Sequence, residues 1–238
     1  MQLTTHLPTT LSAEKATTHP FLSAAGKGLL PARTLTQWLS QDRLYAQAYV
    51  RFIGLLLSKM QLPVVPGAPS PTTRAVGILI DAVVNIQREL QFFEDVAREY
   101  ALDLNAVSGS GSGEGTFGPS PITHAYIDMF MAAGSPAVSV LEGLVVLWAT
   151  EVCYLRAWRY AASFLGEKPA GGRDADGGAL RERFIPNWSS AEFEQFVDSI
   201  AEVVDAMGES VDGEMLGKCE RWWKQVVWLE ERFWPDVQ

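Results

Sequence analysis

Hydrophobic side chains recur every three or four positions along most of this chain, which is the spacing of one face of an α-helix. No stretch keeps the alternation of apolar and polar residues that is typical of a half-buried strand. The pattern predicts helices over residues 12–26, 32–60, 71–100, 121–134, 136–166, 189–208 and 211–236. Serine or proline at several expected starts and glycine near several ends support these boundaries. The predicted fold class is therefore all-α.

Acidic residues interrupt the hydrophobic stripes of these helices. Asp42 falls in the stripe of the helix at 32–60, and Glu230 falls in the stripe of the last helix. Glu151 and Tyr154 form a third polar inclusion in an otherwise apolar segment. Burying an unpaired carboxylate costs several kcal/mol, so a sequence rarely keeps such acids without a use for them. We therefore expect a polar pocket inside a helical core.

The composition fits one folded domain. With 238 residues, 47% of them hydrophobic, and 8 Trp, the chain is long enough and apolar enough to bury one sizeable core. We expect residues 1–238 to form a single helical domain, with flexible loops near the glycine-rich segments 108–118 and 167–179.

The charge of the chain limits the kinds of partner that it can bind. A formal charge of -9 and a pI near 4.9 argue against nucleic acid, because no basic stripe is available to neutralise phosphates. Charged residues interrupt every long apolar segment, so no membrane span is expected. The two cysteines, Cys153 and Cys219, form no C-x-x-C motif, and the first ten residues lack the apolar segment of a signal peptide. We expect a cytoplasmic protein.

Metal and nucleotide sites are not indicated. None of His6, His19 and His124 stands three residues after a Glu, as a di-iron carboxylate bundle would require. The glycine runs follow no predicted strand and lack the Lys-Ser/Thr ending of a phosphate loop. We expect no bound metal.

Short motifs spread over the chain resemble those of the TenA, or thiaminase II, family, whose fold is that of haem oxygenase. In chain order they are His19-Pro20-Phe21-Leu22, Gly28-Leu29-Leu30-Pro31, Trp38-Leu39-Ser40-Gln41-Asp42-Arg43-Leu44-Tyr45, the segment 89–104, Thr123-His124-Ala125-Tyr126 and Glu230-Glu231-Arg232-Phe233-Trp234. Each motif is short, but their order and spacing together are fairly specific. The resemblance implies a single-domain, haem-oxygenase-like helical bundle.

The resemblance also implies a function, because proteins of that family hold a 4-amino-pyrimidine among their helices and hydrolyse a substituent from it. This chain would then be a thiamin-salvage hydrolase that releases an amine from 4-amino-5-aminomethyl-2-methylpyrimidine or a formylated relative. Asp42 would bind the amino edge of the pyrimidine, Tyr45 and Tyr126 would line the ring, and Glu230 would protonate the leaving amine. No cofactor is implied, and we interpret His19 as a capping or packing residue rather than a haem ligand.

The chain departs from the family pattern at two places. In the best-known branch a nucleophilic cysteine stands four residues before a tyrosine, and aligning that tyrosine with Tyr154 puts Thr150 at the cysteine position. The thiol is missing, so Glu151, together with Tyr154, becomes the candidate to activate or replace the attacking nucleophile. We interpret Cys153 as a buried packing residue. Trp188 stands where the family has a tyrosine; its indole can stack on a pyrimidine, but its N–H can only donate.

Two other classes of function stay open at this stage. The chain can be a non-catalytic protein that binds a pyrimidine or another small aromatic ligand, or a regulatory helical protein whose inward acids pair with arginines such as Arg51 or Arg156. We also expect a homo-oligomer, because Trp222, Trp228 and Phe164 fall off the inward stripes and exposed large apolar residues commonly mark an interface.

Overall fold

The computed structural model describes residues 1–64, 67, 70–106, 116–167 and 172–237. Its elements, in chain order, are α1 (Leu3–Thr10), α2 (Glu14–Thr17), α3 (Pro20–Gly26), α4 (Ala32–Ser58), α5 (Pro71–Glu99), α6 (Pro121–Gly134), α7 (Val140–Ala162), the π-helix η1 (Ala179–Phe184), α8 (Ile185–Trp188), α9 (Ala191–Gly208) and α10 (Gly213–Phe233). No strand occurs among these residues. The all-α prediction is confirmed.

Five of the six long helices start where their sequences provide a capping side chain, and α4 alone among these six starts after Pro31 without one. In each case a side-chain oxygen at the N-cap accepts a hydrogen bond from the backbone N–H three residues on, and this satisfies one of the free donors of the first turn. The capping residues are Ser70, Ser120, Ser139, Ser190 and Asp212.

The N-terminal region differs from the sequence prediction. The helix expected at 12–26 is divided into α2 and α3, because proline disfavours helical backbone in the residue before it and His19 precedes Pro20 in an extended conformation. His19 is the N-cap of α3 and accepts a hydrogen bond from the Phe21 N–H at 3.2 Å, in agreement with a capping role. Helix α1 was not expected; its Leu3 and Leu7 are fully buried.

Part of the segment expected to be a flexible loop at 167–179 is held by hydrogen bonds. Asp176 is buried, and its carboxylate accepts the backbone N–H groups of Gly178 and Leu180 at 3.0 and 2.8 Å. Gly177 and Gly178 adopt φ values of 80° and 103°, which favour glycine. Residues 168–171 of this loop, and 108–115 of the other expected loop, lie outside the described residues.

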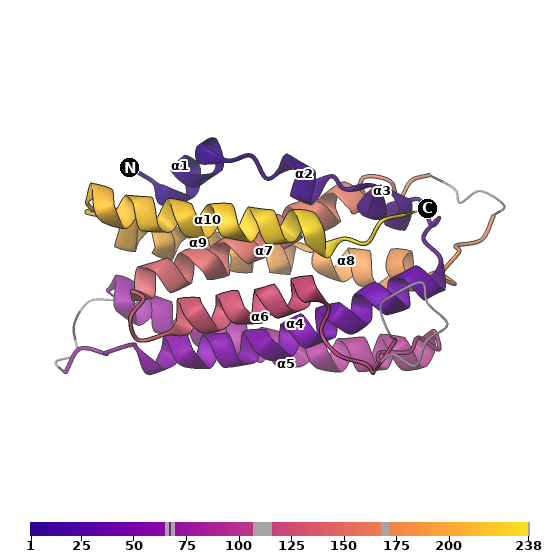
Figure 1. Ribbon diagram of the computed structural model, residues 1–238, viewed down its shortest axis with the longest axis horizontal. Coiled ribbons are helices and arrows are strands. Elements are labelled where there is room, and N and C mark those ends of the chain that lie inside the picture. Colours follow the sequence, from indigo (N-terminus) through magenta and orange to yellow (C-terminus); the bar gives the residue numbers. More distant parts are fainter. Residues whose placement is uncertain (65–66, 68–69, 107–115, 168–171, 238) are drawn as a thin grey trace.

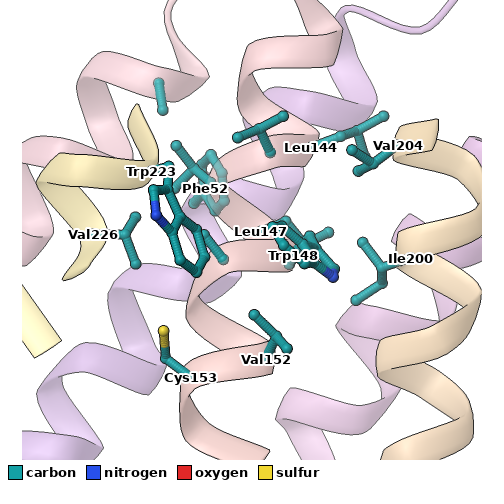
Figure 2. Packing of buried hydrophobic residues seen from close by; sticks show 14 of the residues in the cluster. Phe52, Leu144, Leu147, Trp148, Val152, Cys153, Ile200, Val204, Trp223 and Val226 are labelled. Carbon is teal, nitrogen blue, oxygen red and sulfur yellow. The ribbon is translucent and has the colours of Figure 1, made fainter. Parts of the chain in front are cut away.

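The long helices lie side by side, roughly along the long axis of the molecule (Figure 1). Helix α7 runs between its neighbours and is the most buried of them. Figure 2 shows one part of the core, in which Phe52 of α4, Trp148 of α7 and Trp223 of α10 pack together. Trp148 and Trp223 stack with ring centroids 5.5 Å apart. A second buried cluster gathers aromatic side chains around Trp38 and Trp158.

The three aromatic residues expected at an oligomer interface are placed differently from one another. Trp222 is half-buried and donates its indole N–H to Glu142 at 3.1 Å, and Phe164 is half-buried against Tyr160. Only Trp228 among the three is exposed, at 46%. No helix in the described part of the chain is both long enough and apolar enough to cross a membrane.

Candidate functional site

A cavity of about 440 Å³ opens between α4, α5, α7 and the α8–α9 region. This volume lies within the range of small-molecule sites in proteins. The side chains that give it its chemistry are Asp42, Tyr45 and Tyr49 from α4, Glu89 and Phe93 from α5, Glu151 and Tyr154 from α7, Asn187 and Trp188 from α8, and Phe193 and Phe196 from α9. Five of the eight predicted site residues line it: Asp42, Tyr45, Glu151, Tyr154 and Trp188.

Asp42 projects into this cavity from the middle of α4, as its place in the stripe predicted. It is only 3% exposed, and its Oδ2 accepts a hydrogen bond from the Tyr154 hydroxyl at 3.1 Å. No donor to its Oδ1 is found among the described residues. Burial, reinforced by the nearby Glu89 charge, raises the pKa of Asp42 well above its usual range, although the Tyr154 hydrogen bond acts in the opposite direction.

Glu151 lines the cavity from α7. The Tyr49 hydroxyl on α4 donates a hydrogen bond of 2.5 Å to its Oε1, and this contact joins the two helices. Burial raises the pKa of Glu151 to about 7, while the Tyr49 hydrogen bond partly opposes the rise. A carboxyl group with a pKa near neutrality exchanges protons readily at physiological pH, so Glu151 is suited to general acid–base chemistry.

Glu89 is a cavity carboxylate that the sequence reasoning did not select. Its Oε1 accepts the indole N–H of Trp188, and its Oε2 accepts a hydrogen bond from Asn187 Nδ2 at 3.2 Å. Burial raises the pKa of Glu89 to about 7, and both hydrogen bonds oppose the rise. The signal was present in the sequence, because Glu89 continues the helical stripe of Ala82 and Phe93, both of which are buried.

The inward acids are not neutralised by arginines. Within the described residues, no ion pair includes any of the cavity acids Asp42, Glu89 and Glu151, or Glu230 behind them. Arg51 and Arg156, the partners considered from the sequence, are both exposed. Arg88 also lines the cavity, but it is exposed as well. The pairing of buried acids with arginines, on which the regulatory alternative depended, is therefore not what the structure shows.

Glu230, Tyr126 and Thr150 lie behind the lining rather than on it. Glu230 is 4% exposed and accepts a hydrogen bond of 2.6 Å from the Tyr126 hydroxyl. Tyr126 in turn packs edge-on against Tyr45, which lines the cavity, with ring centroids 5.1 Å apart. Burial raises the pKa of Glu230 to about 8, and the charge of Glu151 adds to this rise.

The position expected for the family thiol does not face the cavity either. The hydroxyl of Thr150 donates to its own helix, to the carbonyl of Leu147 at 2.9 Å. Cys153 is fully buried, and Figure 2 shows it among core residues that include Val152 and Val226. Burial raises the pKa of the Cys153 thiol well above its usual range, so this group stays a neutral thiol. Neither residue belongs to the cavity lining.

Aromatic rings form the wall beside α8. Trp188 stacks on Phe184 with centroids 4.7 Å apart and an interplanar angle of 19°, and it lies 4.4 Å from Trp158. Tyr154 meets Trp188 edge-on at 5.5 Å. These contacts hold the indole in place, and flat aromatic surfaces suit a flat heterocyclic ligand.

The described part of the cavity offers no set of metal ligands. Among the described residues, no group of three or more His, Cys, Asp and Glu side chains is arranged to hold a metal ion. The cavity combines a volume of about 440 Å³, aromatic walls and titratable carboxyl groups, which suits the binding and proton-transfer chemistry of a small basic heterocycle.

Comparisons with known proteins give a family match. The model of the TENA/THI-4/PQQC family matches residues 9–238. A protein of Fusarium pseudograminearum named as a probable transcription factor is 31% identical over 257 residues; the match covers 93% of this chain and 49% of that protein, so the chain spans about half of that relative. A Glycine max protein named as a probable bifunctional TENA-E protein is 20% identical, over 92% of this chain and 85% of that one.

Solved structures share the fold. A TenA homologue from Pyrococcus furiosus superposes with a TM-score of 0.77 at 22% identity, and the match covers 98% of both chains. A TenA-like thiaminase from Sulfolobus solfataricus, described as putative, superposes with a TM-score of 0.68 at 15% identity over 97% of this chain and 93% of that one. At these identities the similarity is one of fold.

Proposed function

This chain belongs to the TENA/THI-4/PQQC family and has the haem-oxygenase-like fold of TenA proteins, and we propose that it is a thiamin-salvage hydrolase. The reaction is the release of an amine from 4-amino-5-aminomethyl-2-methylpyrimidine or a close relative. The observation that carries the proposal is Glu151, a carboxyl group with a pKa of about 7 on the wall of a cavity lined by aromatic residues. Glu151 lines the cavity whereas Thr150, at the expected thiol position, does not, so in this proposal the carboxyl group acts in place of the missing thiol.

Asp42 orients the ring in this proposal. Its free Oδ1 accepts a hydrogen bond from the 4-amino group of the pyrimidine, while Tyr154 fixes the other oxygen. Because its pKa is raised, the carboxyl can also hold a proton and share it with a ring nitrogen. The side chains of Tyr45 and Trp188 form part of the aromatic wall around the heterocycle.

The chemical step is a displacement by water. Glu151 takes a proton from a water molecule as the water oxygen forms a bond to the methylene carbon. The amine is protonated before it departs; the bond between that carbon and the ammonium nitrogen then breaks, and ammonia leaves with the electron pair of that bond. The products are the 5-hydroxymethyl pyrimidine and ammonia, so no oxidant or further reactant is needed.

Glu230 supplies the proton for the leaving nitrogen. Its pKa of about 8 keeps it protonated at neutral pH. Glu230 does not line the cavity, so in this proposal the proton passes through an intervening water molecule. The Tyr126 hydroxyl donates to Glu230, and the Tyr126 ring packs against Tyr45 of the cavity wall. Glu151 is therefore the acid–base group in direct contact with the substrate, and Glu230 acts from the layer behind it.

The test is an assay of the purified chain with 4-amino-5-aminomethyl-2-methylpyrimidine, in which released ammonia and the hydroxymethyl product are both quantified. We expect equal amounts of the two from the wild type. Glu151→Gln should lower kcat by about 10²–10⁴-fold, the usual effect of general acid–base catalysis, and should keep the ligand-induced rise in melting temperature. Glu94→Gln, an exposed residue of α5 outside the cavity lining, serves as the matched control and should leave kcat unchanged.

The hydrolysis assay and the melting-temperature measurement together distinguish the proposed hydrolase from the alternative functions. Binding of the pyrimidine without hydrolysis identifies a non-catalytic binding protein. Absence of any thermal shift with aminopyrimidines rejects the pyrimidine-binding function altogether.

A further inference from the structure

Glu89 is the cavity carboxylate that the proposed reaction does not use. It faces α8 from α5, and two adjacent residues of α8 hold it: Trp188 donates to one oxygen and Asn187 to the other. A carboxylate oxygen accepts up to two hydrogen bonds, so each oxygen keeps one free acceptor site. The side chain lines the cavity, and those free sites are available to a ligand.

The contact with Glu89 also determines which hydrogen-bonding groups of Trp188 are available to a ligand. Its single N–H is used by Glu89, so Trp188 offers no free donor to the cavity. Stacking on Phe184 fixes the plane of that ring. Trp158 lies 4.4 Å away from the same indole, so the side chain is held in place, and a ligand in the cavity meets the Glu89 carboxylate beside a wall that offers no competing donor.

The other cavity acids make this place favourable for positive charge. Asp42 lines the cavity and is only 3% exposed, and no described residue donates a hydrogen bond to its Oδ1. Glu89 and Asp42 repel each other when both are ionised, as do Glu89 and Glu151. A cationic nitrogen among these groups relieves the repulsion, whereas a neutral hydroxyl group does not.

We propose that Glu89 is a specificity-determining residue, which makes the cavity select flat ligands carrying a protonated aliphatic amine over the same ligands with a hydroxyl in its place. This inference rests on the proposed function and names its substrate class: the free, protonated amine rather than the neutral N-formyl form. It also explains how the hydroxymethyl product leaves, because the product lacks the charge that Glu89 binds.

The test measures dissociation constants at pH 7 by calorimetry for two ligand pairs. One pair is the 5-aminomethyl and 5-hydroxymethyl forms of 4-amino-2-methylpyrimidine, and the other is benzylamine and benzyl alcohol. We expect the wild type to bind each amine at least about tenfold more tightly than its alcohol, and Glu89→Gln to lose about tenfold in amine affinity with alcohol affinity within about twofold.

Two further variants separate charge from structure. Glu192→Gln removes an exposed carboxylate from the rim of the same cavity and should keep the amine preference. Glu89→Asp keeps the charge and should retain part of the preference, which also covers the case in which Glu89→Gln fails to fold. Circular dichroism checks the fold of each variant.

The outcomes distinguish this inference from the proposed function. If the wild type prefers the amines but hydrolyses nothing, the proposed function fails and the role of Glu89 stands. If Glu89→Gln keeps the preference, or loses affinity for amine and alcohol equally, the inference is overturned whether or not hydrolysis occurs. A wild type that prefers neither amine also overturns it.

Discussion

The hydroxyl of Tyr49 lies 2.5 Å from Oε1 of Glu151, so the candidate general base on α7 is held by a donor from α4. This hydrogen bond favours the ionised carboxylate, whereas burial favours the protonated form. Together with the charge of Glu89, which adds to the rise, these two effects place the pKa of Glu151 at about 7. Tyr49 is therefore a positioning residue that also sets the pH at which the base works.

Tyr49→Phe should move the pH dependence of hydrolysis upward. Without the hydroxyl, burial acts unopposed and the pKa of Glu151 rises above about 7, so less of the base is ionised at neutral pH. We expect kcat at pH 7 to fall by about 3–10-fold and to recover at higher pH. The measurement is a profile of kcat from pH 5.5 to 9.5.

The wild-type profile should itself be bell-shaped, because activity needs Glu151 ionised and Glu230 protonated. The pKa values of about 7 and about 8 place the maximum between them.

The control for Tyr49→Phe is Tyr160→Phe, which removes a hydroxyl outside the cavity lining and should leave the pH profile unchanged. A Tyr49→Phe profile identical to that of the wild type would show that Glu151 is not the base.

Glu230→Gln should reduce the loss of stability on alkaline titration. The pKa of Glu230 is about 8 in the folded protein and its ordinary value is 4.5, so between these pH values the folded state binds a proton that the unfolded state has released. Stability therefore falls as pH rises through this window. Glutamine does not titrate, so the variant should lose up to about 1.4 kcal/mol less per pH unit.

Urea unfolding of wild type and Glu230→Gln at pH 5, 6, 7 and 8 measures this difference. Titrating groups far from Glu230 are common to both proteins and cancel in the comparison. Parallel free-energy curves for the two proteins would show that Glu230 titrates in the folded state as it does in the unfolded chain.

The helical stripe predicted that Asp42 and Glu230 point inward, and both are buried. It did not predict that only Asp42 lines the cavity, because a period of 3.6 residues gives the direction of a side chain and not the depth at which a cavity begins. Glu89 was overlooked for a related reason. Its donors, Trp188 and Asn187, come from a short helix almost a hundred residues away, and sequence spacing does not show such a contact.

The boundaries of the helices could also be predicted only where local sequence determines them. The long helices could be predicted because capping residues and apolar periodicity agree. Helix α1 has only two buried leucines among polar residues, and its position depends on contacts such as Thr4 with Asp205 at 2.9 Å, which are remote in sequence. The split between α2 and α3 was readable from Pro20, which begins a helix and disfavours helical backbone in the residue before it.

Trp228→Glu should prevent self-association. Trp228 is 46% exposed on α10, and the side chain of Arg232 lies over its ring at 4.3 Å. We predict a homo-oligomer that covers this indole, so a carboxylate at this position would be buried without a partner. Light scattering at micromolar concentration should give an oligomer for the wild type and a smaller species for the variant. Trp222→Phe is the control, because Trp222 is already half-buried against α7. A wild-type monomer would refute the prediction.

Cys153→Ala should leave hydrolysis within about threefold of the wild type. The thiol is fully buried, its pKa is raised well above the ordinary value, and it does not line the cavity, so it provides neither a thiolate nor access to the substrate. For the same reason, treatment of the folded protein with a thiol-alkylating reagent should leave kcat unchanged, with mass spectrometry reporting whether the thiol has reacted. Thr150→Ala should also retain turnover, since that hydroxyl bonds to its own helix. If Cys153→Ala instead abolishes hydrolysis while Glu151→Gln does not, the reaction depends on the thiol, and the carboxylate mechanism proposed for Glu151 is wrong.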